Sequence, residues 1–204
     1  MSSLFGATRV PDHLHPYVAA DAVRTGDFRA IASLFSLASV PHTADPLSWV
    51  AFALVLGASR SGHTCVDFAH ISLWSPEGSD DANLHWPADS GPWLDAVTSC
   101  SGLVCTPAQR NAHPRAPFVL DGTRLYSARS YEEEVNVAAF LRAATREGRL
   151  NIVTGGPGSG KTTKVAETIV AHVQSTAGTD TVALAAPTGL AAKRMARALR
   201  GAVG

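Results

Sequence analysis

Hydrophobic residues recur at helical spacing over the first sixty residues of the chain. The pattern predicts helices over residues 17–24 and 28–38, and Asp27 is predicted to cap the second helix. One apolar stripe runs along that second helix: Phe28, Ile31, Leu34 and Phe35. A stripe of this width predicts a helix that packs one side against a protein core.

A third helix is predicted over residues 47–60, and it is apolar on nearly every side. Asp45 is the expected N-cap and Pro46 the first helical residue. Helices without a polar face are usually buried within a bundle or at an interface, so we expect this helix at the centre of the N-terminal part. Residues 62–68 then predict a turn and a short extended stretch.

Residues 75–117 are rich in Pro, Gly, Ser, Asp and Asn, which predicts a long surface segment with one short helix over 92–99. The segment contains His85, Trp86 and Trp93. These side chains either contact a ligand or anchor the segment to the core, and the amphipathic character of Trp favours the anchoring role.

A hairpin and a long helix are predicted next. The hairpin covers residues 118–126, because the pair Asp121-Gly122 between two apolar stretches is a favoured turn. The helix covers residues 130–146 with Ser130 as its cap. Its apolar side chains share one face: Tyr131, Val135, Ala138 and Leu141. The three glutamates of its first turn complement the helix dipole and are interpreted as solvated side chains.

The last 55 residues alternate between strand and helix patterns. Buried strands are predicted over 150–153 and 181–186, and helices over 164–175 and 190–200. This alternation indicates a parallel α/β sheet with its ligand site at the carboxyl ends of the strands.

A phosphate-binding motif lies between the first predicted strand and its helix. Gly155, Gly160, Lys161 and Thr162 stand at the spacing of the P-loop. A glycine-rich turn can direct backbone N–H groups at a phosphate, and the following helix adds its positive dipole end. The lysine can reach the β and γ phosphates, and the Thr162 hydroxyl can bind Mg²⁺. The alternative is an ordinary glycine-rich turn at a helix start.

Composition and charge narrow the class of protein. The chain has 204 residues and no long uncharged apolar run, so neither a membrane span nor a secretory signal is expected, and a cytoplasmic location is predicted. Its three cysteines predict free thiols in a reducing compartment. The alternative for Cys100 and Cys105 is a metal site completed by His113.

The net charge of zero hides an asymmetry. Residues 1–149 hold 11 basic and 15 acidic residues, for a net charge of −4, whereas residues 150–204 hold 6 and 2, for a net charge of +4. In the last helix Lys193, Arg197 and Arg200 share one face. A basic surface next to a phosphate site indicates a polyanion partner, although a solvated helix face explains the same pattern.

Segments in both halves of the chain resemble a known family. The run Gly155–Thr163, followed by Pro187-Thr188-Gly189 and the helix after it, is similar to the first two helicase motifs of RecD-type DNA helicases. Residues 62–68 and 120–126 resemble parts of the N-terminal domain of RecD, the subunit of exodeoxyribonuclease V (RecBCD).

The resemblance implies an ATP-dependent motor that moves 5′ to 3′ on single-stranded DNA in a complex acting on double-strand breaks. ATP and Mg²⁺ would contact the loop and helix start: Gly155, Gly156, Pro157, Gly158, Ser159, Gly160, Lys161, Thr162 and Thr163. Lys161 and Thr162 would be catalytic. Single-stranded DNA would contact Pro187, Thr188, Gly189, Lys193 and Arg197. The N-terminal region would dock on RecB- or RecC-like subunits.

The expected architecture has three parts. Residues 1–128 form a mainly helical α+β docking domain, 129–148 a connecting helix, and 149–204 an incomplete RecA-like P-loop NTPase domain. The only carboxylates after Lys161 are Glu167 and Asp180. We therefore expect a truncated fragment that binds nucleotide weakly and does not hydrolyse it.

Two other functions fit the sequence. The chain can be an assembly module whose P-loop is vestigial, or a small P-loop kinase. The kinase interpretation is the weaker one, because it needs a substrate lid and an acidic strand end. The resemblance also implies a glutamine before the P-loop that recognises adenine. The only glutamines here are Gln109 and Gln174, so no residue is assigned to that role.

Overall fold

The computed structural model divides the chain into two compact units, Met1–Phe140 and Leu141–Gly204. The residues that it describes are 10–41, 44–76, 84–148, 150–156, 158–175, 183, 185–186 and 188–203. Within these residues no helix is both long and apolar enough to cross a membrane.

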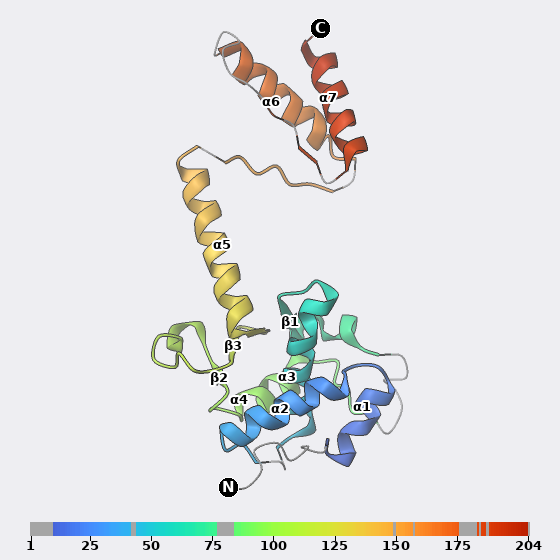
Figure 1. Cartoon of the computed structure of the whole chain (residues 1–204), viewed down its shortest axis with the longest axis vertical. Coiled ribbons are helices and arrows are strands. Elements are labelled where there is room, and N and C mark those ends of the chain that lie inside the picture. Colours follow the sequence, from blue (N-terminus) through green and yellow to red (C-terminus); the bar gives the residue numbers. More distant parts are fainter. Residues whose placement is uncertain are drawn as a thin grey trace. The chain divides into compact units, whose positions relative to one another are not determined.

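The first unit contains helices, short 3-10 helices (η) and four strands (Figure 1). In chain order they are η1 Asp12–Leu14, α1 His15–Ala19, α2 Thr25–Leu37, α3 Pro46–Ala58, η2 Ser59–Ser61, β1 Cys65–Asp67, η3 Phe68–Trp74, α4 Ser90–Thr98, β2 Val104–Cys105, η4 Pro107–Gln109, β3 Phe118–Asp121, β4 Arg124–Ser127 and α5 Ala128–Arg146, whose last six residues belong to the second unit. The expected mainly helical α+β domain is confirmed.

The apolar helix α3 lies at the centre of this unit, as predicted. The Asp45 carboxylate accepts a hydrogen bond from the Leu47 N–H at 2.8 Å, and Pro46 is the first helical residue. Ten of the 13 residues of α3 are buried, and the helix packs against α2, α4 and β1. The ring of Phe52 stacks on Phe118 of the sheet with 4.5 Å between centroids. Each such buried side chain contributes about 1.5–3 kcal/mol relative to exposure.

The four strands form one sheet in the order β1-β4-β3-β2. The predicted hairpin is β3 and β4, which are antiparallel, whereas β2 runs parallel to β3. Asp121 pairs with Arg124, so Gly122 and Thr123 are the central turn residues, one position later than predicted. Gly122 has φ +60°, a left-handed conformation that favours glycine in a two-residue hairpin loop.

The two faces of the sheet contact different clusters. One face joins the main core through Val66, Phe118, Leu120 and Leu125. The other face carries one cross-strand row, Cys65, Tyr126, Val119 and Cys105, in a second cluster with Ala116 and Tyr131. Burial in this cluster raises the pKa of Tyr126 to about 12. Successive side chains of a strand point to opposite faces, so a sheet that is covered on both faces places alternate residues in different clusters.

The described part of residues 75–117 differs from the predicted surface segment. It contains α4, which confirms the predicted short helix, but also β2, and it contributes Leu84, Trp93 and Leu103 to the main core. The Trp93 side chain is 0% exposed, its Nε1 donates to the carbonyl oxygen of Pro87 at 2.9 Å, and Trp86 packs edge-on against it. The anchoring role of the tryptophans is therefore confirmed, but the expectation of little structure is wrong.

Two predicted helix starts are wrong. The α2 N-cap is Arg24, and Asp27 is the third helical residue, where its carboxylate accepts from the Arg24 N–H at 3.2 Å. Helix α5 begins at Ala128, and the Ser127 hydroxyl accepts from the Ser130 N–H at 3.1 Å. Because β4 ends at Ser127, the cap comes from the last strand residue instead of Ser130.

Residues 17–24 were predicted as one helix, but α1 ends at Ala19. Asp21 has φ +53°, a conformation that cannot continue a right-handed helix. The chain turns there and enters α2 at Thr25.

A charged pair joins α2 to the end of α3. Arg60 donates from Nη1 to Oδ1 of Asp27 at 3.0 Å and from Nη2 to Oδ2 at 2.5 Å, and Asp27 is only 7% exposed. The hydrogen bond to Asp27 raises the pKa of the Arg60 guanidinium. A Cβ at Gly57 would lie 2.9 Å from Arg60 Nη2. Glycine at position 57 of α3 therefore leaves room for the guanidinium group of Arg60.

The first turns of α5 are held against the sheet by three side chains. Tyr131 packs edge-on against Tyr126, with 5.5 Å between ring centroids. Glu132 accepts from Arg110 Nη2 at 2.6 Å, and Glu134 accepts from the Thr64 hydroxyl at 2.9 Å. The glutamates therefore follow the first turn of α5 and form specific contacts, where the sequence predicted only solvated side chains in the first turn.

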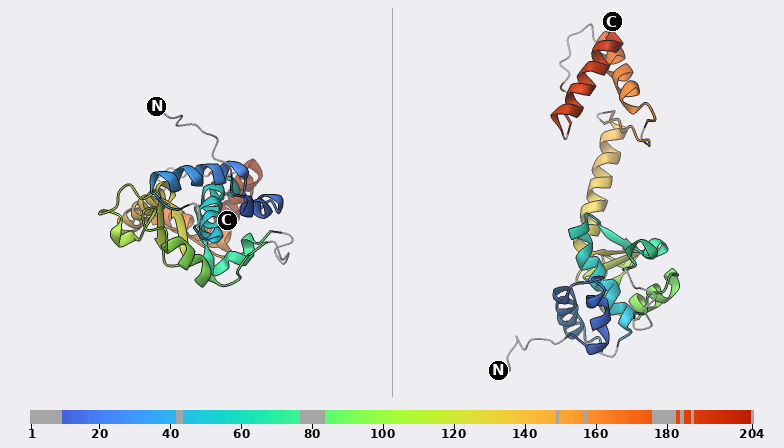
Figure 2. Two further views of the ribbon diagram at one scale, coloured as in Figure 1. Left: turned by 90° about the horizontal axis from the view of Figure 1, so that it is seen from below. Right: turned by 90° about the vertical axis from the view of Figure 1, so that its right-hand side faces the viewer.

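The second unit contains α6 Lys161–Ser175 and α7 Gly189–Val203, which pack against each other and lie side by side in Figures 1 and 2. Both predicted helices are confirmed. Residues 150–153 are not a strand, and residues 183, 185 and 186 are not in a strand either. Residues 181, 182 and 184 of the second predicted strand lie outside the described residues.

The predicted parallel sheet is thus not found in the described residues of the second unit. A strand is defined by backbone pairing with a neighbour, and residues 150–153 pair with no strand that the structure describes. The glycine-rich loop is consequently preceded by an irregular stretch.

The carboxylate of Asp67 connects β1, η3 and the hairpin turn. It accepts from the Thr123 hydroxyl at 2.7 Å, the Ala69 N–H at 3.0 Å, His70 Nδ1 at 3.3 Å and Arg124 Nε at 3.5 Å. Burial raises the pKa of this carboxyl, but the four hydrogen bonds together lower it below its ordinary value.

We predict that Asp67→Ala lowers the free energy of unfolding at pH 7 by about 0.5–1.5 kcal/mol, because the half-buried Thr123 hydroxyl and three exposed donors lose their acceptor. Because the pKa of Asp67 is lowered in the folded state, the stabilisation by its carboxylate is complete above the unfolded-state pKa of about 3.9. This stabilisation is lost as the pH falls through the folded-state pKa. The difference between wild type and variant should therefore shrink below about pH 4.

Urea denaturation of both proteins at pH 7 and pH 3 measures this difference. Asp95→Ala is the control, because Asp95 is exposed on α4. Equal stability of wild type and Asp67→Ala at pH 7 would contradict the prediction.

Candidate phosphate-binding site

The glycine-rich loop leads directly into α6. Gly158 and Gly160 both have φ +75°, the left-handed region in which glycine is favoured, and α6 begins at Lys161. The first helical hydrogen bond that the structure gives runs from the Lys164 N–H to the Gly160 carbonyl at 3.0 Å. Pro157 lies outside the described residues. The predicted turn and helix start are therefore present.

The side chain of Lys161 folds back over this loop. Its Nζ donates to the carbonyl oxygens of Gly155 and Gly156, the second at 2.5 Å, and lies 3.4 Å from the Ser159 hydroxyl. The loop therefore positions a full positive charge beside its own backbone. From there the ammonium group can bind a phosphate oxygen placed at the helix start.

The start of α6 supplies further donors. The first N–H groups of a helix lack intrahelical partners and point along the axis toward the loop, so those of Lys161, Thr162 and Thr163 are directed there. The first turn contains no acidic residue, and Thr162 and Thr163 are exposed. An anion at this position would meet backbone donors and the positive end of the helix dipole.

These groups fit a Mg²⁺–nucleotide in part. Amides and an ammonium suit phosphate oxygens, and the exposed Thr162 hydroxyl suits Mg²⁺ held jointly with phosphate. Glu167 is exposed on α6, and Asp180 lies outside the described residues. The described site therefore offers phosphate ligands but no carboxylate at a strand end to activate water.

The second predicted motif serves as a helix start. The Thr188 hydroxyl accepts from the Ala191 N–H at 3.3 Å and caps α7, whose first residue is Gly189. Pro187 lies outside the described residues. Capping by Thr188 is a structural role that the sequence analysis did not assign.

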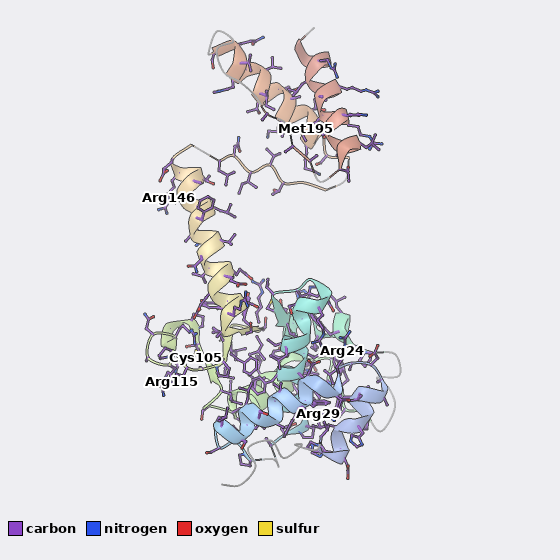
Figure 3. The ribbon with its side chains drawn as sticks, viewed as in Figure 1. Arg24, Arg29, Cys105, Arg115, Arg146 and Met195 are labelled. Carbon is purple, nitrogen blue, oxygen red and sulfur yellow. The ribbon has the colours of Figure 1, made fainter. Side chains whose placement is uncertain are left out.

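Helix α7 has two distinct faces. Met195, labelled in Figure 3, belongs to a half-buried set that also contains Ala191, Ala192, Ala196, Ala198 and Leu199. The exposed positions include the three predicted basic residues and one that was missed: Lys193, Arg194, Arg197 and Arg200. Arg194 was missed because it stands one position outside the i, i+4, i+7 series. Arg194 stands three residues before Arg197, a spacing that places both side chains on one side of the helix.

The alternative metal site is wrong for the described residues. Cys100 is buried in the main core, and Cys105 lies in the second cluster with its thiol 3.7 Å from the Phe118 carbonyl. No group of three or more His, Cys, Asp or Glu side chains suited to a metal occurs in the described part of the chain. The two thiols are separated because Cys105 lies on the sheet face of the second cluster, whereas Cys100 lies in the main core that covers the other face.

A hollow of about 740 Å³ lies in the first unit, remote in sequence from the loop. Its lining includes Val23, Asp27, Leu54, Arg60, Leu73 and Trp74. Leu73, one of the lining residues, is 83% exposed.

Both parts of the chain match models of known protein families. Residues 21–126 match the family model described as RecBCD enzyme subunit RecD, N-terminal domain, and residues 138–203 match an AAA domain. RecBCD enzyme subunit RecD of Mycobacterium tuberculosis (strain H37Rv) is 34% identical over 184 residues, covering 74% of this chain and 30% of the relative. Its counterpart in Mycolicibacterium smegmatis is 31% identical over 212 residues, covering 89% and 36%.

The chain thus spans about a third of the length of these curated relatives. The N-terminal family model covers slightly more than half of the chain, and the AAA domain match contains the glycine-rich loop and both helices of the second unit. The chain therefore belongs to the RecD family of RecBCD enzyme subunits.

Proposed function

We propose that this chain carries the nucleotide-binding segment of an ATP-dependent 5′–3′ DNA helicase subunit in a RecBCD-type exodeoxyribonuclease V complex that acts on double-strand breaks. The observation that supports it is the position of the Lys161 ammonium, within hydrogen-bond distance of Gly155, Gly156 and Ser159 at the start of α6. Family membership supports the motor assignment, because an AAA domain match covers these residues.

The residues of the loop would share the work of holding ATP. The amides of residues 158–163 would bind the β and γ phosphate oxygens, and Lys161 would neutralise their charge. Bound Mg²⁺, held by Thr162, supplies electrostatic stabilisation of the phosphates. Lys161 and Thr162 are thus the proposed catalytic residues of the site.

Hydrolysis by this chain alone is not expected. After Lys161 the sequence contains only Glu167 and Asp180 as acids, and neither stands at the end of a described strand. Orientation of the attacking water by a carboxylate or glutamine is a large part of phosphoryl-transfer catalysis. We therefore propose nucleotide binding without turnover for residues 1–204.

We predict that the 204-residue chain binds Mg·ATP and that Lys161→Ala weakens binding about 10- to 100-fold, since a charge-assisted hydrogen bond contributes about 1.5–3 kcal/mol. Titration with a fluorescent ATP analogue measures the affinity, and phosphate release measures turnover. Lys164→Ala is the matched control, because this exposed lysine lies on the same helix outside the motif. Equal binding by Lys161→Ala and wild type would contradict the site, and hydrolysis lost in Lys161→Ala would contradict the absence of turnover.

The exposed basic face of α7 is the proposed contact for single-stranded DNA, together with Pro187, Thr188 and Gly189 at the helix start. Four cations on a surface without neighbouring acids attract a phosphate backbone regardless of sequence. Because Thr188 already caps the helix through its hydroxyl, it would contact DNA through its backbone or methyl group.

We predict that Lys193→Ala/Arg197→Ala reduces the salt dependence of oligonucleotide binding. Each lost phosphate contact lowers the slope of log K against log salt by about 0.7 for a single strand, so the double variant should lose about 1.4. Fluorescence anisotropy at several salt concentrations measures the slope. Arg142→Ala/Arg146→Ala, an equally spaced exposed pair on α5, is the charge-matched control. A slope unchanged by the α7 variant would exclude this face as the DNA contact.

A second candidate function is a non-enzymatic assembly module with a vestigial P-loop, in which the first unit docks on RecB- or RecC-like subunits. The hollow beside Arg60 and Trp74, with Leu73 at its edge, favours this role. The two functions are compatible, and they differ in whether the loop needs to bind nucleotide.

We predict that Leu73→Glu weakens capture of RecB- or RecC-like subunits by the full chain at least tenfold, because a charge replaces an apolar contact. Leu37→Glu is the matched control, since Leu37 is 84% exposed and Leu73 is 83% exposed, but Leu37 does not line the hollow. The affinity of each variant is measured as binding to the purified subunit immobilised on a sensor surface. Equal binding by both variants would remove the hollow as the docking surface.

A further inference from the structure

The side chain of Ser159 fills the space beside the first glycine of the loop. A Cβ built on Gly155 would lie 2.5 Å from the Ser159 hydroxyl oxygen and 3.4 Å from the Ser159 Cβ. The first distance is too short for any real Cβ contact, whereas the second is an ordinary close contact. The hydroxyl group must therefore rotate away before residue 155 can carry a side chain.

The same hydroxyl also lies 3.4 Å from the Lys161 ammonium. That ammonium donates to the Gly155 carbonyl as well, and the Ser159 N–H donates to the Gly156 carbonyl at 3.4 Å. One side chain thus touches the beginning of the loop and the charge at its end. The remaining loop glycines behave differently, because a Cβ on Gly156, Gly158 or Gly160 meets nothing within 4 Å.

We propose that Ser159 is a positioning residue for Lys161. Its hydroxyl packs against Gly155 and faces the ammonium, so the pair Gly155–Ser159 sets the place from which Lys161 approaches phosphate. This inference rests on the proposed binding of nucleotide by the loop. The Ser159 hydroxyl acts through Lys161 and through the loop shape, and the hydroxyl itself needs no contact with the nucleotide.

The arrangement makes the two positions depend on each other. Ser159→Ala removes the hydroxyl from the ammonium. Gly155→Ala forces the same hydroxyl to rotate away, because Cβ and Oγ cannot both occupy the space. Each change therefore removes the same contact. Once the hydroxyl is absent, a Cβ at Gly155 meets the Cβ of residue 159 at 3.4 Å and the Cγ of Lys161 at 3.6 Å. Both are ordinary contact distances, so the second change should add little.

The experiment is a double-mutant cycle on the full chain, with Mg·ATP affinity measured by fluorescence titration. We expect Ser159→Ala and Gly155→Ala each to weaken binding about three- to tenfold and the double variant to bind no more weakly than either. Ser159→Thr keeps the hydroxyl and should stay within about twofold of wild type. Gly26→Ala on α2 is the control for a glycine-to-alanine change outside the loop, because its Cβ would point into open space at an ordinary φ. Wild-type affinity in Ser159→Ala, or multiplicative losses in the double variant, would overturn the inference.

A second measurement separates this inference from the proposed function. Amide hydrogen exchange of residues 155–163 in the protein alone should be faster in Ser159→Ala and Gly155→Ala, and no faster in the double variant. If wild type fails to bind Mg·ATP, the proposed function fails, and the exchange rates still decide whether Ser159 positions the loop. Unchanged exchange in both single variants would overturn the positioning role. Thermal unfolding of every variant verifies that the fold is retained.

Discussion

The first unit depends on one constraint, which is that the apolar helix α3 has almost no side that tolerates water. Every neighbouring element must therefore present apolar surface to it, and α2, α4 and the sheet do so. The requirement explains why a polar segment folds inward to place Trp93 in the core. It also explains the charged pair at the end of the helix, because Asp27 can be buried there only with the guanidinium of Arg60 beside it.

Sequence patterns predicted the parts of this fold that are decided locally. The cap at Asp45 and the buried helix after it need only neighbouring residues, and the hairpin needs only a turn glycine between apolar stretches. Composition failed for residues 75–117, since a few aromatic side chains outweigh many polar ones when a large apolar surface must be covered. The predicted cap at Ser130 is also wrong, because the position of the cap depends on where β4 ends.

The candidate site shows the same division between local and distant causes. The positive φ of Gly158 and Gly160 and the helix start at Lys161 are properties of a short segment. The motif predicted the glycine-rich turn and the helix after it, although the helix begins three residues earlier than predicted. The strand over 150–153 was not found, because pairing partners far along the chain decide whether an apolar run is a strand. The contact of Ser159 with Gly155 was also invisible, because residue types do not give side-chain direction.

The junction between β4 and α5 has a consequence for sequence length. Ser127 ends the strand and Ala128 starts the helix, so no spare residue separates them. One inserted residue would turn the helix by about 100° about its axis. Tyr131, Glu132 and Glu134 would then leave their partners together, because all three lie within the first two turns. Relatives that share this fold should accordingly tolerate changed side chains at the junction far better than a changed number of residues.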